Sequence, residues 1–383
     1  MSDYKTPGVY VEEAPSVSRP ITGVGTTIAG FIGVAPTPAT DPNPSPTPAT
    51  VPTPSAETNK GVPQAVNNWG EFKKKFPNNK GNTDVLANAV FGFFDNGGNF
   101  CWVAGVADLS KDCQTVLNAF KAIDEISLVA VPLPLGTDTN TRKQINDAVL
   151  KHCEEMKDRF AILDGVYVEG KLDESSIYGG TKSKYGAVYL PYLDVDGKGN
   201  YMPPSGYLAG VYARVDTERG IYKAPANEVI RGIQGVQVAI DKFQQGNLND
   251  KKINVIRLFN GNVTVWGART ISENLEYINI RRTLIYLSKS IDRGTQWAIF
   301  EPNTPALWQK IIRNVSDFLL VQWRSGALFG NTSQEAFYVK CDAETNPPEL
   351  REQGQLNAEV AVSIVKPAEF VVFTISQTTL PSR

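Results

Sequence analysis

Between residues 60 and 200 the apolar positions alternate between two spacings, one typical of helices and one typical of strands. Three amphipathic helices are predicted where apolar residues recur every three or four positions, at 82–95, 111–123 and 141–158. Short apolar runs that predict strands lie at 100–104, 127–132, 159–164 and 185–191. Strands that alternate with helices of this length are typical of a largely parallel sheet covered on both faces, so we expect an α/β fold.

An earlier apolar run, at 21–34, predicts the first strand of the core. The run is rich in glycine, which suggests a dinucleotide-binding loop. That interpretation fails, because Gly23 and Gly25 are followed by Gly30 rather than by a glycine three residues on, and no helical pattern begins there.

Two long amphipathic helices are predicted in the C-terminal third. The later one, at 304–325, carries one wide apolar stripe, with Thr304 suited to the N-cap and Pro305 to the first helical position. The earlier one, at 272–291, is expected to bury Leu275 on its apolar side.

Two strands are also predicted in this third. One covers 297–300 and ends at 301–303, just before the later helix. The other covers 369–375, and it is apolar at both alternating sets of positions. We therefore expect this last strand to be buried on both faces.

Residues 1–20 are predicted to form an extended arm, because Pro7, Pro15 and Pro20 prevent a helix of useful length. The segment 8–13 has the composition of a strand, and a strand of that length is not stable alone. It must add to a sheet of its own chain or of a neighbour, and the residues alone leave both open.

A stretch at 35–57 has proline at nearly every second position, which favours extended polyproline II structure without a core. The simplest interpretation is a solvated linker or surface loop. A proline-rich ligand for a partner is the alternative.

Composition narrows the class of protein. The chain has 383 residues and a formal net charge of −2, so no general attraction to nucleic acid or to an anionic membrane is expected. No apolar stretch is long enough to predict a membrane span, and the sequence does not open with a signal-peptide pattern. We expect the protein to stay in the cytoplasm of the cell that makes it.

Residues that carry chemistry are few. Cys101, Cys113, Cys153 and Cys341 show no metal-ligand spacing and are expected to be reduced thiols. The single histidine, His152, is predicted to be exposed or at a helix end. We expect neither a cofactor nor a metal, and no enzyme activity.

Two further motifs fail on spacing. Asp194 and Asp196 suggest a calcium loop, but its fifth position would be Lys198 and its twelfth Ser205, neither of which is a suitable ligand. No glycine-lysine pair is followed by serine or threonine, so a P-loop in its usual form is excluded.

Several short segments, spread in order along the chain, resemble the contractile tail sheath family. That family includes phage tail sheaths, type VI secretion sheaths and phage-like contractile injection systems. The segments lie at 6–13, 94–101, 161–164, 203–206, 209–214, 223–227, 268–270, 280–282, 300–303, 326–330 and 367–370.

This resemblance implies two α/β domains with extended arms at both ends. The conserved domain would combine the N-terminal strand at 21–34 with 207–368, and 60–206 would be an inserted domain. The remaining parts would be an N-terminal arm, a linker or surface loop and a C-terminal strand with its arm, at 1–20, 35–59 and 369–383.

The resemblance also implies a structural function. Many copies would polymerise helically around an inner tube, and contraction from a metastable extended state would drive the tube through a target envelope. Further partners would be baseplate and terminator or cap proteins, without direct contact to nucleic acid or insertion into a membrane. An injection system is favoured; a true phage tail, and a soluble α/β enzyme with an unrecognised small-molecule site, are the alternatives.

Two sets of residues are expected to make these contacts. The strands of the arms would pair with neighbouring subunits through Val9, Tyr10, Val11, Glu12, Phe370, Val371, Val372 and Phe373. The polar face of the helix at 304–325 would contact the tube through Lys310, Arg313, Asp317 and Arg324. An ordinary solvated helix face is the equal alternative for the second set.

Overall fold

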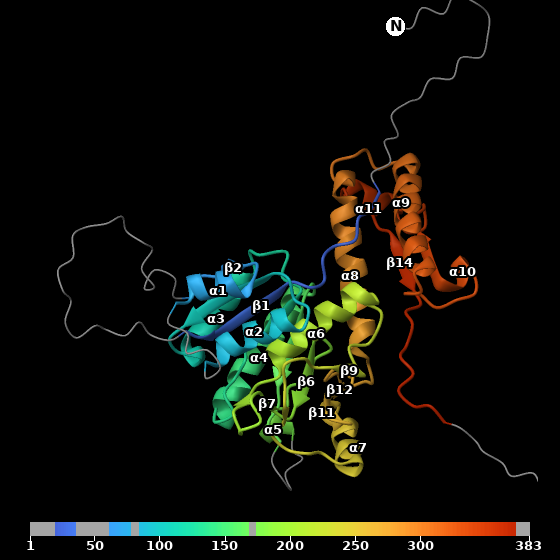
Figure 1. Ribbon diagram of the computed structural model, residues 1–383. Helices are drawn as coiled ribbons and strands as arrows, with labels where there is room; N and C mark the ends of the chain where they lie inside the picture. Colours follow the sequence, from blue (N-terminus) through green and yellow to red (C-terminus); the bar gives the residue numbers. More distant parts are fainter. Residues whose placement is uncertain (1–19, 36–60, 78–83, 168–173, 373–383) are drawn as a thin grey trace, which may run out of the picture.

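The computed structural model describes residues 20–35, 61–77, 84–167 and 174–372. The predicted arm strand Val9 to Glu12, the proline-rich stretch from 36 onward and Phe373 lie outside the described residues. The described part is of mixed α/β class, as predicted, with a large sheet and a separate group of C-terminal helices (Figure 1).

The centre of the structure is a nine-stranded sheet in the order β2-β3-β1-β4-β5-β6-β11-β12-β9. Neighbouring strands from β3 to β11 are all parallel, whereas β2, β12 and β9 pair antiparallel at the two edges. The largely parallel sheet is thereby confirmed. Its strands are β1 (Ala29–Val34), β2 (Gln64–Val66), β3 (Cys101–Val106), β4 (Leu128–Ala130), β5 (Phe160–Asp164), β6 (Gly186–Leu190), β9 (Glu228–Val229), β11 (Ile253–Phe259) and β12 (Asn262–Trp266).

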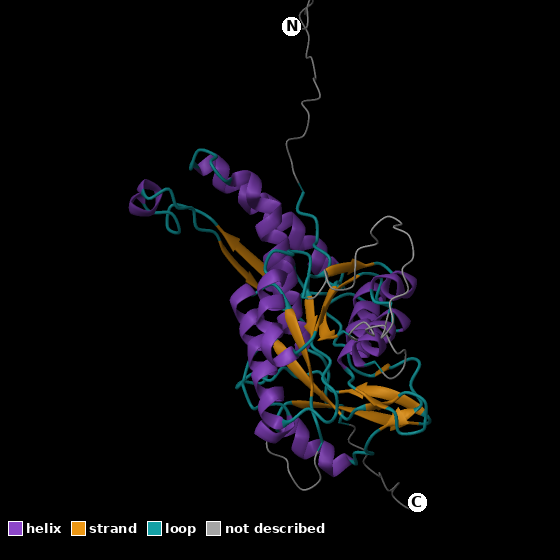
Figure 2. Ribbon diagram, turned by 90° about the vertical axis from the view of Figure 1, so that its left-hand side faces the viewer, coloured by secondary structure: helices purple, strands orange, loops and turns teal. Residues whose placement is uncertain are grey.

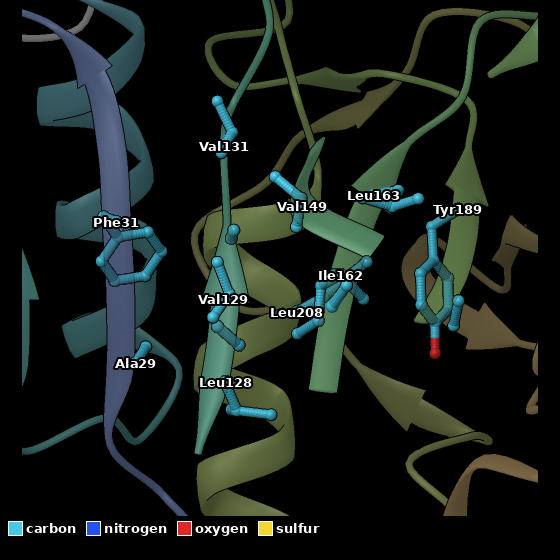
Figure 3. Close-up of a cluster of buried hydrophobic side chains, with 14 of the residues drawn as sticks. Ala29, Phe31, Leu128, Val129, Val131, Val149, Ile162, Leu163, Tyr189 and Leu208 are labelled. Atoms are coloured by element: carbon cyan, nitrogen blue, oxygen red, sulfur yellow. The ribbon is translucent and has the colours of Figure 1, made fainter. Parts of the chain in front are cut away.

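Helices lie on either side of this sheet (Figure 2). Two packed pairs cover it, α2 with α6 and α3 with α4. Because both faces are covered, every residue of β5 is buried, and Figure 3 shows Val149 of α4 and Leu208 of α6 beside Ile162 of β5. The bounds of these helices are α2 (Val85–Asp95), α3 (Leu109–Phe120), α4 (Thr139–Met156) and α6 (Ser205–Glu218).

Aspartate side chains fix where these helices begin. Asp84, Asp108 and Asp138 are the N-caps of α2, α3 and α4, and each accepts a hydrogen bond from a backbone N–H of the first turn. The start of α6 is held differently, because Asp164 at the end of β5 accepts hydrogen bonds from both the backbone N–H (2.8 Å) and the hydroxyl (2.8 Å) of Ser205.

Smaller elements surround the sheet, and one group forms a three-stranded sheet in the order β10-β7-β8. They are α1 (Trp69–Lys75), α5 (Glu174–Ile177), β7 (Leu193–Asp194), β8 (Tyr201–Met202), β10 (Gly235–Val236), α7 (Lys242–Asp250), α10 (Ser333–Ala336), β13 (Phe337–Lys340), α11 (Pro348–Glu352) and β14 (Glu359–Val362). Strands β13 and β14 pair antiparallel in a two-stranded sheet.

Helix α8 (Ile278–Thr295) joins two apolar cores. Its N-terminal half contributes Ile278 and Ile285 to the core of the large sheet. Its C-terminal half contributes Leu287 to a second core with α9 (Pro305–Arg324) and the β13–β14 sheet. The predicted start of α9 is confirmed, with Thr304 as N-cap and Pro305 as the first helical residue.

Some predicted elements in the C-terminal third are wrong. The helix expected from 272 begins only at Ile278, because 270–277 form a loop closed by a hydrogen bond from the backbone N–H of Thr270 to the carbonyl of Glu276 (2.9 Å), and Leu275 is exposed. The strand expected at 297–300 is a 3-10 helix (Gln296–Ala298) followed by a turn.

The burial expected for the terminal strand is not found within a single chain. Residues 369–372 make no strand here, and Phe370, Val371 and Val372 are 72%, 68% and 85% exposed. An apolar run is buried only where a second surface covers it, and these three side chains remain largely exposed in the part of the chain that the structure describes.

The domains implied by the resemblance share the large sheet. Strand β1, assigned to the domain of the C-terminal third, pairs with β3 and β4 of the segment 60–206. The implied boundary between 206 and 207 falls within α6. None of the helices within the described ranges combines the length and apolarity that crossing a membrane requires.

Candidate assembly surfaces

The segment that leads from the N-terminus into β1 is fastened along α8. Ile21 packs in the second core, and the backbone N–H of Val24 donates a hydrogen bond to the hydroxyl oxygen of Ser290 (3.1 Å). Further on, the hydroxyl of Thr26 donates to Asp216 Oδ2 (2.6 Å). The point from which residues 1–19 depart is therefore fixed to α8.

A buried ion pair ties this segment to α6 and α8. The guanidinium of Arg282 donates to both carboxylate oxygens of Asp216 (2.9 and 2.6 Å) and to the carbonyl of Thr26 (3.1 Å). The two charged side chains are 3% and 2% exposed, and the guanidinium lies 4.8 Å from the centre of the Tyr212 ring. Because each charge is paired and hydrogen-bonded, its burial is tolerated.

Glu369 holds the start of the C-terminal segment. Its carboxylate accepts hydrogen bonds from Arg269 Nε (3.0 Å) and a second guanidinium nitrogen (2.9 Å), from the Tyr277 hydroxyl (2.6 Å) and from the Asn249 amide (3.1 Å). Four residues earlier, the carbonyl of Val365 accepts from the Asn279 amide (3.1 Å). The chain is thus anchored immediately before its exposed apolar residues.

The electrostatics of this anchor favour an ionised carboxylate. Burial alone would raise the pKa of Glu369, but the hydrogen bonds from Arg269, Tyr277 and Asn249 outweigh burial and hold the pKa below its ordinary value. Burial and the hydrogen bond to Glu369 raise the pKa of Tyr277 to about 12, so its hydroxyl remains a donor at neutral pH.

A groove with a volume of about 820 Å³ opens beside this anchor. Its lining includes the aromatic side chains of Tyr222, Trp266 and Tyr277 and, on the C-terminal segment, Phe370 and Val371. Beyond Glu369 the segment therefore leaves the body of the chain as exposed apolar residues next to a wide opening.

The two anchors lie near opposite ends of α8. A Cβ on Gly294, near the end of this helix, would come within 2.6 Å of Ile21 of the N-terminal segment. Tyr277, the N-cap at its start, contacts Glu369 of the C-terminal segment. An 18-residue helix is about 27 Å long, so the terminal segments start from well-separated points.

The polar face of α9 is exposed. Lys310, Arg313, Asp317 and Arg324 follow at helical spacing, and none of their side chains has an ion pair or hydrogen bond within the described ranges. The exposed side chain of Val321 lies on the same face. Three cations and one anion give this face a positive balance while the opposite face fills the second core.

The single histidine and the four cysteines are buried. His152 is buried and not exposed, which corrects the prediction: burial and then the charge of Arg159 lower its pKa to about 4. All four cysteines are buried free thiols, and burial raises their pKa. Within the described ranges no cluster of acidic, histidine or cysteine side chains could hold a metal ion.

Reasoning from the sequence missed the roles of Arg269, Arg282 and Glu369. All three lie inside segments that resemble sheath proteins, at 268–270, 280–282 and 367–370. The sequence feature that could have identified them is a charged residue within or beside an apolar pattern, because such a residue needs a partner when it is buried. The partners lie 66 and 100 residues away, so spacing could not identify them.

Two family models match most of the chain. The model of the phage tail sheath protein central domain matches residues 101–271, and that of the phage tail sheath C-terminal domain matches 271–378. The chain belongs to the contractile tail sheath family. A prophage major tail sheath protein of Pseudomonas aeruginosa is 26% identical over 185 residues, which are 46% of each chain, so this alignment spans under half of that relative.

Two solved sheath structures match over nearly the whole length. The anti-feeding prophage helical sheath in its contracted state is 29% identical, with a TM-score of 0.79, and the match covers 98% of this chain and 100% of that one. The sheath complex of an extracellular contractile injection system (PVC) in its contracted state is 28% identical, with a TM-score of 0.77 and 99% coverage of both chains.

Proposed function

We propose that many copies of this chain polymerise helically around an inner tube as the sheath of a contractile injection system. The observation that carries the proposal is the full-length similarity to the two contracted sheath structures. A true phage tail remains the alternative within the family, with DNA delivery in place of an injected cargo. The particle would be assembled in the cytoplasm of the producing cell.

In this proposal the chain is not an enzyme. The extended sheath is metastable, and the energy for driving the tube is stored in the contacts between copies. Shortening exchanges one set of contacts for another, so no nucleotide is consumed by the sheath during the stroke.

The terminal segments would keep neighbouring copies joined during that exchange. Phe370, Val371 and Val372 are exposed apolar residues that follow a firmly held anchor at Glu369. An extended segment of this kind can add to a sheet of another copy, where main-chain hydrogen bonds provide affinity. We assign the same role to Val9–Glu12 and to Phe373.

The polar face of α9 would contact the tube through Lys310, Arg313, Asp317 and Arg324. Its positive balance fits a tube surface with acidic residues. Contacts between exposed charges are weakened by water and salt, which suits an attachment that holds before contraction and releases during it.

The further partners of the proposal are the baseplate and a terminator or cap. Support for the baseplate comes from a match to a chain of the anti-feeding prophage baseplate structure, with a TM-score of 0.78 and 98% coverage of this chain. Direct binding to nucleic acid or to a membrane is not part of the proposal.

Electron microscopy of the purified chain, alone and co-expressed with a candidate tube protein, tests this function. Hollow cylinders in either sample, and filled ones with the tube, are expected. Uniform small particles in both samples at every concentration would contradict the proposal and favour a soluble α/β enzyme.

A further inference from the structure

The loop between α8 and α9 projects an apolar residue into solvent. Phe300 is as exposed as in a free peptide (102%), and Ile299 beside it is 63% exposed. Phe300 also has a φ of 67°, a backbone conformation that residues other than glycine rarely adopt. Strained backbone conformations of this kind are found mostly at functional sites such as ligand clamps and switch regions.

The opposite end of α8 carries the groove of about 820 Å³ beside Trp266, Tyr222 and Phe370. Figure 1 shows the α8–α9 loop at one end of α8 and the strands β9 and β12 near the other. One chain therefore presents an apolar projection and an apolar-walled groove about 27 Å apart, which its own loop cannot bridge.

The unpaired charges at the two places are opposite. Around the loop, Asp292 and Glu301 are exposed and have no ion pair within the described part of the chain. At the groove, the carboxylates of Glu228 and Glu369 are already paired with Lys223 and Arg269.

The groove is also lined by cations that have no ion pair within the described residues. Arg219 and Lys366 line it, are exposed and have no ion pair within the ranges that the structure describes. The loop and the adjoining end of α8 thus carry two unpaired anions, and the groove carries two unpaired cations.

We infer that the α8–α9 loop of one copy docks in the groove of the next, with Phe300 against the aromatic wall and Glu301 facing Arg219 or Lys366. The two surfaces are different, so the contact is head-to-tail, and head-to-tail contacts that do not close into a ring build helical polymers. The inference rests on the proposed sheath function and adds a contact between copies in which the α8–α9 loop, and not a terminal segment, enters the groove.

Disulfide cross-linking tests the contact directly, with the full chain carrying Phe300→Cys and Ala368→Cys. Both positions are exposed, Ala368 lines the groove, and the four native cysteines are buried. Oxidation should give a ladder of covalent oligomers, because each copy links to the next. The matched control, Phe329→Cys with Ala368→Cys, uses another exposed phenylalanine and should give no ladder.

Charge reversal supplies a second readout. Glu301→Lys and Lys366→Glu should each raise the concentration needed for polymerisation, by roughly tenfold, and the double variant should recover most of the loss. Recovery would not follow if either substitution acted only by disturbing the fold.

Cylinders without a ladder would overturn this inference and leave the sheath function standing, whereas neither cylinders nor ladder would contradict both. A ladder that appears only after removal of residues 373–383 would assign the groove to the chain's own tail and overturn the inference too. Protection of the thiol introduced by Phe300→Cys when the tube protein is present, again without a ladder, would assign the loop to the tube.

Discussion

At the scale of single residues, three acidic side chains join parts that are far apart in the sequence. Asp164 links β5 to the start of α6, Asp216 links α6 to α8, and Glu369 links the C-terminal segment to Arg269. Each is partly or wholly removed from water and receives several hydrogen bonds. Loss of one such group leaves its partners unsatisfied, which costs more than the bond itself contributes.

Asp164 predicts a dependence of stability on pH. Burial raises its pKa from 3.8 to about 7, against the opposing effect of hydrogen bonds from Ser205. Between these values the folded chain holds a proton that the unfolded chain releases, so this contribution is complete below pH 3.8 and is lost as the pH rises through 7.

The measurement is the melting temperature of wild type and Asp164→Asn between pH 5 and 8. The wild type should lose stability relative to the variant as the pH rises, because only the wild type has a carboxyl group to ionise at this site. A constant difference between the two proteins across this range would contradict the assignment.

Local rules predict some of these residues and not others. Thr304 and Pro305 were identified because a helix start depends on neighbours in the sequence. The burial of His152 could also have been predicted, because it follows Ile145 and Val149 at helical spacing on their buried face. The pairing of Arg282 with Asp216 could not, because 66 residues separate them.

At the scale of elements, α8 is the connection between the sheet and the C-terminal helices. It takes part in both cores, and the buried pair of Arg282 and Asp216 lies on its N-terminal half. Near its other end, Lys289 forms ion pairs with Asp158 (2.8 Å) and Asp124 (3.2 Å). The large sheet and the group of C-terminal helices are therefore both fixed to α8.

Asp216→Asn tests the buried connection. Removing one partner of a buried ion pair leaves the guanidinium of Arg282 uncompensated, which costs about 3–5 kcal/mol of the free energy of unfolding. Urea unfolding of the unassembled chain measures this. Asp317→Asn, on the exposed face of α9, is the control and should change the value by less than about 0.5 kcal/mol. Equal effects would refute the importance of the pair.

The charged face of α9 makes a separate prediction about the tube. Lys310→Glu combined with Arg313→Glu should reduce retention of the tube protein by roughly tenfold near physiological salt, with the melting temperature unchanged. Retention is measured by co-purification, and Arg351→Glu on α11 serves as the control. Undiminished retention at all salt concentrations would leave this face as an ordinary solvated surface.

The helices and strands of the sheet could be predicted from spacing, because each buries a regular apolar stripe. The failures lie where an apolar run lacks that support. Residues 299–300 and 370–372 are apolar but largely exposed, so their composition matches a buried strand without the surfaces that would bury one. The fold of a single chain does not explain why these residues are apolar. We propose that contacts between copies bury them.

At the scale of the whole molecule, the N-terminal and C-terminal segments are anchored near opposite ends of α8. The N-terminal segment is fixed at Ile21 and Thr26, and the C-terminal segment at Glu369. In the proposed sheath, terminal segments that start from firm anchors would let copies move relative to one another while they stay linked. This arrangement suits a lattice that must shorten without coming apart.

The most direct test is electron microscopy of the purified full chain beside a variant that lacks residues 1–19. The account predicts long hollow cylinders from the full chain and their loss on truncation, because the missing segment would pair with a neighbouring copy. Cylinders that survive the truncation would contradict the proposed linkage, and a full chain that never forms cylinders, even with its tube, would contradict the sheath function itself.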